Sequence, residues 1–225
     1  MKTVVKAMAI AAIGMLALST PASATQVFAT SYDTPNGDGQ ASGGSFNYWD
    51  LGYTGSGTTN VDGAALAGGL GDLTDGVVAS DFWFNTETGA GAGPYVGWYA
   101  PVTLNPTVTF HFGANTIINA IAIHMDNSNA GGVFAPQAIL VNGVAHAFTA
   151  PANGTIGTVN LTGLNLSGGT HTIQFQQAPG TWTFVSEVTF DGGRGVPEPA
   201  TWGLMILGFG AAGSMLRRRR MANPP

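Results

Sequence analysis

The side chains of this 225-residue chain that could carry catalysis are four histidines and the acidic residues. The histidines lie far apart, outside any H-E-x-x-H metal motif, and the chain contains neither a Gly-x-Ser-x-Gly nucleophile motif nor a phosphate-binding loop. Two carboxylates can hydrolyse glycosides, but the acids form many pairs and the sequence singles out none. Cysteine is absent, which excludes disulfides, thiolate metal ligands and cysteine nucleophiles. We therefore expect the protein not to be an enzyme.

Charge is unevenly distributed along the chain. Lys2 and Lys6 open it, Arg217–Arg220 nearly close it, and Arg194 is the only basic residue between them apart from histidine. Eleven of the twelve acidic residues lie between Asp33 and Asp191, so residues 25–194 have a formal charge of −10. Because a body this acidic repels phosphate backbones, the sequence predicts no nucleic-acid partner.

Apolar residues alternate with polar ones through residues 25–194. In "TVTFHFG", Val108 and Phe110 share one strand face, and in "THTIQFQQ", Ile173 and Phe175 do the same. This period of two indicates half-buried antiparallel strands. Together with the many glycines and few charges, it predicts one all-β domain with the fold class of an antiparallel jelly-roll β-sandwich.

Two segments of this domain carry local signals. Asn142-Gly143, between the apolar runs of "AILVNGVAHAF", is the favoured pair for a type I′ hairpin turn. Residues 36–76 are rich in glycine and poorly patterned. We expect them to wrap the sandwich as loops, to add one or two strands and to form no second core.

The N-terminal residues 1–24 have the pattern of a secretory signal peptide. Lys2 and Lys6 precede an apolar run, and Ala22 and Ala24 provide the small residues that signal peptidase requires. Signal peptidase is therefore an expected partner, with cleavage after Ala24. The mature protein would begin outside the cytoplasm.

An uncharged run near the C-terminus predicts a transmembrane helix. Residues 201–216 would form a helix of about 24 Å, somewhat short for a hydrocarbon core of about 30 Å. The four arginines of residues 217–220 would stay on the cytoplasmic side by the positive-inside rule. The acidic domain would then lie on the other side of the membrane.

The whole C-terminal segment, residues 195–225, resembles the PEP-CTERM sorting signal of exported proteins in Gram-negative bacteria. The residues that carry this resemblance are Pro197, Glu198, Pro199, Trp202, Arg217, Arg218, Arg219 and Arg220. The resemblance implies recognition by exosortase, a membrane-embedded protease and transpeptidase. It also implies transient residence in the inner membrane and delivery to the cell surface or extracellular matrix.

The domain itself resembles the discoidin-like, galactose-binding-like sandwich between residues 73 and 192. Leu73-Thr74-Asp75-Gly76 followed by Trp83 is similar to the opening turn of that family, and "PTVTFHFGANTIINAIAIH" and "SEVTFDG" are similar to its strand pair and closing strand. The sequence departs from the family pattern just before Trp83, where Ser80-Asp81-Phe82 replaces the usual threonine.

This second resemblance implies a structural calcium ion held by Asp75 and Glu187. Calcium prefers several oxygen ligands, and carbonyl groups of the glycine-rich turns would complete the set. Asp72 and Asp81 are close enough in sequence to join. The alternative is that all four are ordinary acids of turns and strand faces.

Carbohydrate binding is the function that the family resemblance implies most directly. Trp98 and Tyr99 in "GPYVGWYAP", and Asp126, Asn127 and Asn129 in "HMDNSNAGG", lie in glycine-rich segments where a sugar site could form. For the tryptophan the alternative is a place in the core.

The sequence thus predicts an exported, non-catalytic module that binds exopolysaccharide. A structural protein of the matrix or biofilm without a soluble ligand is the main alternative. A secreted polysaccharide-acting enzyme and an ice-binding protein are further alternatives, although the body lacks a regular Thr-x-Thr array.

Overall fold

The computed structural model of the chain describes residues 25–39, 45–87, 89–194 and 207–209. The expected signal peptide, the Pro-Glu-Pro motif and the arginine cluster lie outside these residues. So does most of the expected transmembrane helix, of which only Leu207–Phe209 are described, in helical conformation. Within the described ranges, no helix is both long enough and apolar enough to cross a membrane.

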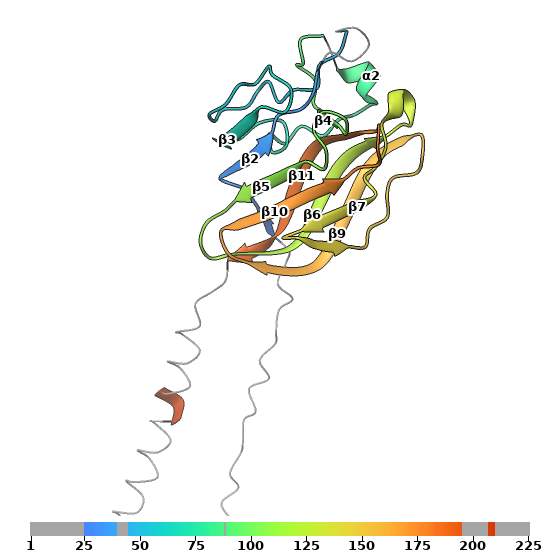
Figure 1. Ribbon diagram of the computed structural model, residues 1–225. Coiled ribbons are helices and arrows are strands. Elements are labelled where there is room, and N and C mark those ends of the chain that lie inside the picture. The colour runs from blue at the N-terminus through green and yellow to red at the C-terminus, as the bar shows by residue number, and fades with distance from the viewer. Residues whose placement is uncertain (1–24, 40–44, 88, 195–206, 210–225) are drawn as a thin grey trace, which may run out of the picture.

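Two antiparallel sheets pack face to face, which confirms the expected β-sandwich (Figure 1). The five-stranded sheet runs in the order β1-β11-β6-β9, with β4 pairing the start of β11. Its strands are β1 (Thr25–Val27), β4 (Val96–Tyr99), β6 (Thr116–Asn127), β9 (Thr155–Ser167) and β11 (Trp182–Arg194).

The six-stranded sheet runs in the order β3-β2-β5-β10-β7-β8. Its strands are β2 (Ser31–Pro35), β3 (Ala65–Gly69), β5 (Thr107–His111), β7 (Ala138–Val141), β8 (Val144–His146) and β10 (Thr170–Gln176). Two short helices complete the described domain, the α-helix α2 (Trp83–Thr86) and the 3₁₀ helix η1 (Ala130–Gly132).

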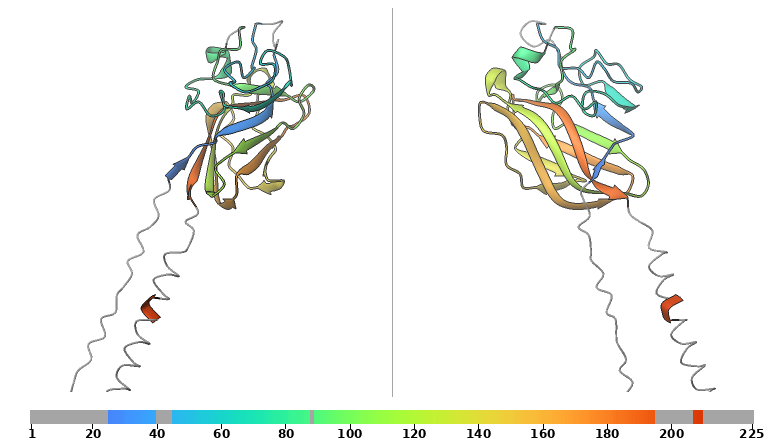
Figure 2. Two further views of the ribbon diagram at one scale, coloured as in Figure 1. Left: turned by 90° about the vertical axis from the view of Figure 1, so that its left-hand side faces the viewer. Right: turned by 180° about the vertical axis from the view of Figure 1, so that it is seen from behind.

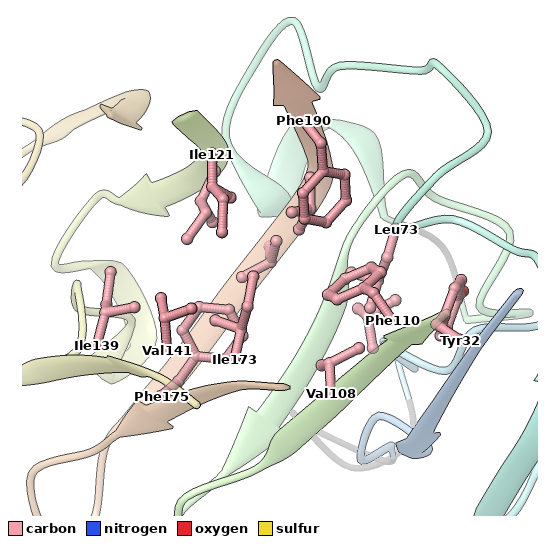
Figure 3. Close-up of a cluster of buried hydrophobic side chains, with 14 of the residues drawn as sticks. Tyr32, Leu73, Val108, Phe110, Ile121, Ile139, Val141, Ile173, Phe175 and Phe190 are labelled. Atoms are coloured by element: carbon pink, nitrogen blue, oxygen red, sulfur yellow. The ribbon is translucent and has the colours of Figure 1, made fainter. Parts of the chain in front are cut away.

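The main core lies between the two sheets. The alternating positions of β5 and β10 are buried as expected and meet apolar side chains of β6 and β11 (Figure 3). Phe110 of β5, for example, contacts Phe190 of β11 edge to face, with 4.9 Å between the ring centroids. Each large apolar side chain buried in this way contributes roughly 1.5–3 kcal/mol.

The predicted hairpin turn is confirmed. Asn142 and Gly143 connect β7 to β8 with φ angles of 50° and 78°. Both angles are positive, as a type I′ turn requires, and the right-handed twist of such a turn matches that of the strands.

A second hydrophobic cluster covers the outer face of the five-stranded sheet near the start of β11. It consists of Tyr48, Ala79, Trp83, Tyr95, Val133 and Phe184, with Phe46 and Trp182 partly buried against them. Phe46 and Tyr48 come from the glycine-rich segment and pack against Trp83 of α2 and Phe184 of β11, so the cluster belongs to the sandwich and is not a separate core of that segment. Alternation within β11 places Phe184 on this outer face and its neighbour Val185 in the main core.

The two ends of the domain emerge together. Thr25 pairs with Gly192, so the start of β1 lies beside the end of β11. Helices α2 and η1 lie at the opposite end of the sandwich (Figures 1 and 2). Since β11 has 13 residues, it spans roughly 40 Å between these ends.

Candidate functional site

A cavity of about 270 Å³ lies at the end of the sandwich that carries α2 and η1, since Trp83 and Gly131 line it. We call it the aromatic pocket, and its lining residues are Tyr48, Trp83, Tyr99, Gly131, Val133, Trp182 and Phe184. Among the residues that the structure describes, no charged side chain lines it. The residues come from β4, β11, α2 and two loops, so the pocket exists only in the folded domain.

A stacked pair of rings forms one wall of the aromatic pocket. Tyr99 of β4 and Trp182 of β11 are cross-strand partners, and their rings lie 4.7 Å apart at 22°. Both residues are only partly buried. Tyr48 contacts the ring of Trp182 edge to face at 5.1 Å and supports it from below the surface. The pair is therefore a firmly held apolar platform that reaches solvent.

The loop around η1 forms the opposite wall. Gly131 has a φ of 63°, and a Cβ atom there would lie 2.9 Å from the ring of Trp83. Any larger residue at this position would combine backbone strain with a clash. Asn129, with a φ of 61°, is exposed beside this wall.

Trp98 does not belong to this pocket. Its side chain is 0% exposed, its ring stacks on Phe175 in the main core, and its Nε1 donates a hydrogen bond of 2.9 Å to the Pro35 carbonyl. Trp98 is therefore a core residue, and the prediction that it contacts a ligand was wrong. Adjacent residues of a strand point to opposite faces, which is why Tyr99 reaches the pocket and Trp98 does not.

Asp126 and Asn127 are also buried. Asp126 accepts hydrogen bonds from the backbone N–H of Trp83 at 2.9 Å and of Ser128 at 2.6 Å. Asn127 accepts one from the backbone N–H of Ala135 at 2.9 Å. These two side chains position the loops around the pocket and are not exposed to a ligand. Of the five expected contacts, only Tyr99 and Asn129 lie at an accessible surface.

Sequence reasoning missed Trp182 and Trp83 as pocket residues. Trp182 alternates with Phe184 and therefore had the pattern of a core residue. One signal pointed the other way: Trp182 is the first residue of its strand and follows a Pro-Gly turn, where a side chain often reaches the end of the sandwich.

The predicted calcium ligands do come together, in a different cavity. Asp75 and Glu187 both line a space of about 380 Å³ between β1, the 74–78 turn and β11, which we call the acidic cavity. Glu187 accepts a hydrogen bond of 2.9 Å from the Gly76 N–H and is 3% exposed. Burial raises the pKa of Glu187 to about 7, and the charge of Asp75 contributes to this rise.

Asp72 and Asp81 do not line the acidic cavity. Asp72 lines a separate cavity beside Gly91–Gly93, where burial, followed by the charge of Asp50, raises its pKa to about 8. Asp81 is exposed and accepts a hydrogen bond from the Phe82 N–H at the start of α2. Among the described residues, no group of three or more histidine, aspartate or glutamate side chains is arranged to hold a metal ion.

A two-sheet antiparallel sandwich with a pocket among the loops at one end is the architecture of discoidin-like, galactose-binding-like modules. Residues 29–152, just over half of the chain, match the family described as discoidin domain-containing receptor 1/2, DS-like domain. The chain therefore belongs to this family. Residues 195–220 match the PEP-CTERM protein-sorting motif, so the module is part of an exported protein that is handled through the membrane.

Comparison with solved structures and with curated proteins does not identify a ligand. One solved structure that resembles the chain comes from work on the architecturally intricate Streptococcus pneumoniae beta-galactosidase, BgaA. It is 12% identical with a TM-score of 0.36, and the likeness covers 53% of this chain and 82% of that one. A likeness this remote supports no statement about ligand or activity. No curated protein matches the chain.

Proposed function

We propose that this exported module binds a carbohydrate, of the class found in extracellular polysaccharide, in the aromatic pocket. The observation that carries the proposal is the stacked, partly exposed Tyr99–Trp182 pair in a cavity at the loop end of a discoidin-like sandwich. Sugar rings present a C–H face that packs on aromatic rings, and their hydroxyl groups form a polar rim.

The chemistry of the lining narrows the class of sugar. The lining residues within the described part of the chain are all uncharged, which favours a neutral sugar over an acidic one. A volume of about 270 Å³ is at the small end of ligand pockets, which suits one sugar unit and not a long enclosed segment. Asn129 and the backbone groups of the η1 loop would bond the hydroxyl groups.

The position of the pocket also supports this function. The sorting motif begins at residue 195, directly after β11, whereas Trp182 lies at the other end of that strand. The pocket is therefore roughly 40 Å along the strand from the membrane-handled segment. A glycan outside the cell would reach it without obstruction by the membrane.

Replacing Trp182 by alanine tests the pocket. We expect the exported chain to be retained on a glycan array or on immobilised exopolysaccharide, and Trp182→Ala to weaken that binding about tenfold or more, since half of the stacking platform is lost. Phe28→Ala, which removes a ring that is 72% exposed outside the pocket, is the matched control and should bind as the wild type does. Equal binding by both variants would overturn the proposed site, and no retention on any glycan would favour a structural matrix role.

We further propose that the chain is processed by exosortase near residues 197–199 and then reaches the surface or matrix of a Gram-negative cell. In this proposal residues 201–216 span the inner membrane temporarily, with Arg217–Arg220 on the cytoplasmic side. The match of residues 195–220 to the sorting motif supports this course.

Substituting the sorting motif tests the processing step. Glu198→Ala should leave a longer product that fractionates with membranes, because the motif is no longer recognised. Met221→Ala, which lies just outside the matched residues, should be processed normally. The mass of the mature chain decides between the outcomes: an unchanged mass for Glu198→Ala would exclude exosortase processing at this motif.

We also propose that the acidic cavity binds calcium. Asp75 and Glu187 would be its carboxylate ligands, and carbonyls of the 74–76 turn would supply further oxygens, since two carboxylates alone do not satisfy a calcium ion. The fit is supported by the burial of Glu187, whose carboxylate accepts one hydrogen bond, from Gly76. The ion would contribute stability by joining the turn to β11 and would take no part in a reaction.

Calcium should raise the thermal unfolding midpoint by roughly 5–10 °C at pH 8 when present at about 100 times its dissociation constant. The rise should shrink at pH 5.5, because Glu187, with a pKa of about 7, is then mostly protonated and a proton competes with the ion. Glu187→Gln should abolish the rise, whereas Asp81→Asn, outside the cavity, should retain it. A midpoint that is the same in calcium and in EDTA would exclude the site.

A further inference from the structure

The edges of the two sheets differ in how they are protected. Strands β1 and β8 are edges of three residues each, and the far side of β3 is bridged by Ser56. The far side of β4 is bonded by the backbones of Asp38 and Tyr48. Strand β9 is the exception, because it is an edge of 13 residues that pairs only with β6 among the described strands.

The backbone of β9 is available for pairing over most of its length. Its ladder with β6 is continuous from Thr155 to Thr162. Pro151 lies against Gly157 near its start, but from Thr158 onward its backbone makes no hydrogen bond to a loop among the described residues up to Ser167. The N–H and C=O groups on the far side of this part of the strand therefore face outward.

The sequence of β9 lacks the usual protection of an exposed edge. The strand reads TIGTVNLTGLNLS and contains no charged residue and no proline, two of the devices that prevent edge-to-edge pairing. A bulge, which is another such device, lies between Thr162 and Leu166, so the unprotected part of the edge is residues 158–162. Val159 and Leu161 point into the core, while Asn160 and Thr162 are exposed. An exposed edge stretch without such devices is a site where another strand can add.

The charge distribution indicates what kind of partner can supply the added strand. Residues 127–186 contain no aspartate, glutamate, lysine or arginine, although the domain as a whole has a formal charge of −10. Two copies of the domain repel each other through most of their surfaces. Along the flank formed by β7 to β10 they can approach without bringing two acids together, so a second copy is a compatible partner there.

We propose that two copies of this chain pair through β9, antiparallel and about a twofold axis, so that the five-stranded sheet continues from one copy into the other. Strand β9 starts beside the loop end of the sandwich and finishes near the end of β11, since Thr155 pairs with Asn127 and Ile117 pairs with both Ser167 and Gly193. Antiparallel pairing therefore points the two aromatic pockets in opposite directions. If each pocket holds a sugar, the pair joins two glycan strands.

Single-cysteine substitution tests this pairing, because the natural chain has no cysteine. Thr158→Cys, Asn160→Cys and Thr162→Cys are made one at a time in the full chain, and the exported protein is analysed on a non-reducing gel. We place the twofold axis at Asn160, the middle of these three positions, so that Asn160 faces its own copy and Thr158 faces Thr162. Asn160→Cys should then give several-fold more disulfide-linked dimer than Ser80→Cys, an exposed position in a loop. Dimer at β9 no stronger than at Ser80 would overturn the proposal.

Sedimentation equilibrium of the exported protein gives an independent test that needs no cysteine. The wild type should show a mass that rises towards twice that of one copy with concentration. Thr162→Asp places one charge of the same sign on each side of the pair and should lower the dimer fraction, whereas Ser80→Asp should not. A wild type that stays monomeric, or equal dimer fractions in both variants, would exclude pairing through β9. Glycan binding by the aromatic pocket does not enter either experiment.

Discussion

Trp98→Ala is expected to lower the free energy of unfolding by roughly 3–5 kcal/mol. The side chain is 0% exposed, and its ring stacks on Phe175 with 5.8 Å between the centroids. Alanine would leave a large cavity between the sheets and would leave the Pro35 carbonyl without its hydrogen bond from Nε1. Urea unfolding of the exported domain, followed by circular dichroism, measures the change.

The matched control for this experiment is Phe28→Ala. Phe28 is also a large aromatic residue, but it is 72% exposed, so its loss should change stability by about 0.5 kcal/mol or less. If Trp98→Ala were as mild as this control and instead abolished glycan binding, Trp98 would be a ligand-facing residue and the core assignment would be wrong.

Asp126→Ala is expected to lower the free energy of unfolding by roughly 2–4 kcal/mol. Its carboxylate is fully buried and accepts hydrogen bonds from the backbone N–H groups of Trp83 and Ser128. Both donors would be left without this acceptor. Because Trp83 lines the aromatic pocket, the same variant should also weaken glycan binding, through displacement of α2 and not through a lost contact.

Two further variants separate this positioning role from a direct one. Asp126→Asn keeps one carbonyl oxygen as an acceptor and should recover part of both losses. Asp191→Ala removes an acid that is exposed near the other end of the sheet and should change neither. Loss of glycan affinity in Asp126→Ala without any loss of stability would contradict the positioning role and would indicate direct contact with the sugar.

The strands and the hairpin turn were predictable because they depend on local patterns. Alternation of side chains in β5 and β10 is a property of a few neighbouring residues, and so is the preference of Asn142-Gly143 for positive φ angles. The same alternation separates Trp98 from Tyr99, which point to opposite faces of β4. Treating both as ligand contacts overlooked this consequence.

The second hydrophobic cluster was not predictable in this way. Alternation assigns a residue of β11 to one face of the sheet, but whether that outer face meets solvent depends on segments far away in sequence. Phe46 and Tyr48 cover it from within a glycine-rich loop that has no pattern of its own. The aromatic pocket lies between these covering residues, η1 and β11. Its lining could therefore not be predicted without first knowing that the glycine-rich loop covers this face.

Two residues of the acidic cavity were predictable from a family resemblance, although no local pattern connects them. Gly76 and Glu187 are 111 residues apart in sequence, and no local pattern connects the turn with the last strand. The resemblance of the opening turn and the closing strand to one family placed Asp75 and Glu187 together before any geometry was known. Asp72 and Asp81 had only proximity in sequence in their favour, and both lie outside the cavity.

The most direct test of the carbohydrate-binding proposal is a calorimetric titration of the glycan that the array retains best. The wild-type domain should bind it with one site per chain, and Trp182→Ala should show an affinity lower by an order of magnitude or more, or no heat at all, while its unfolding midpoint stays high enough for it to be fully folded. A folded Trp182→Ala variant that binds the glycan as tightly as the wild type would contradict the assignment of carbohydrate binding to the aromatic pocket.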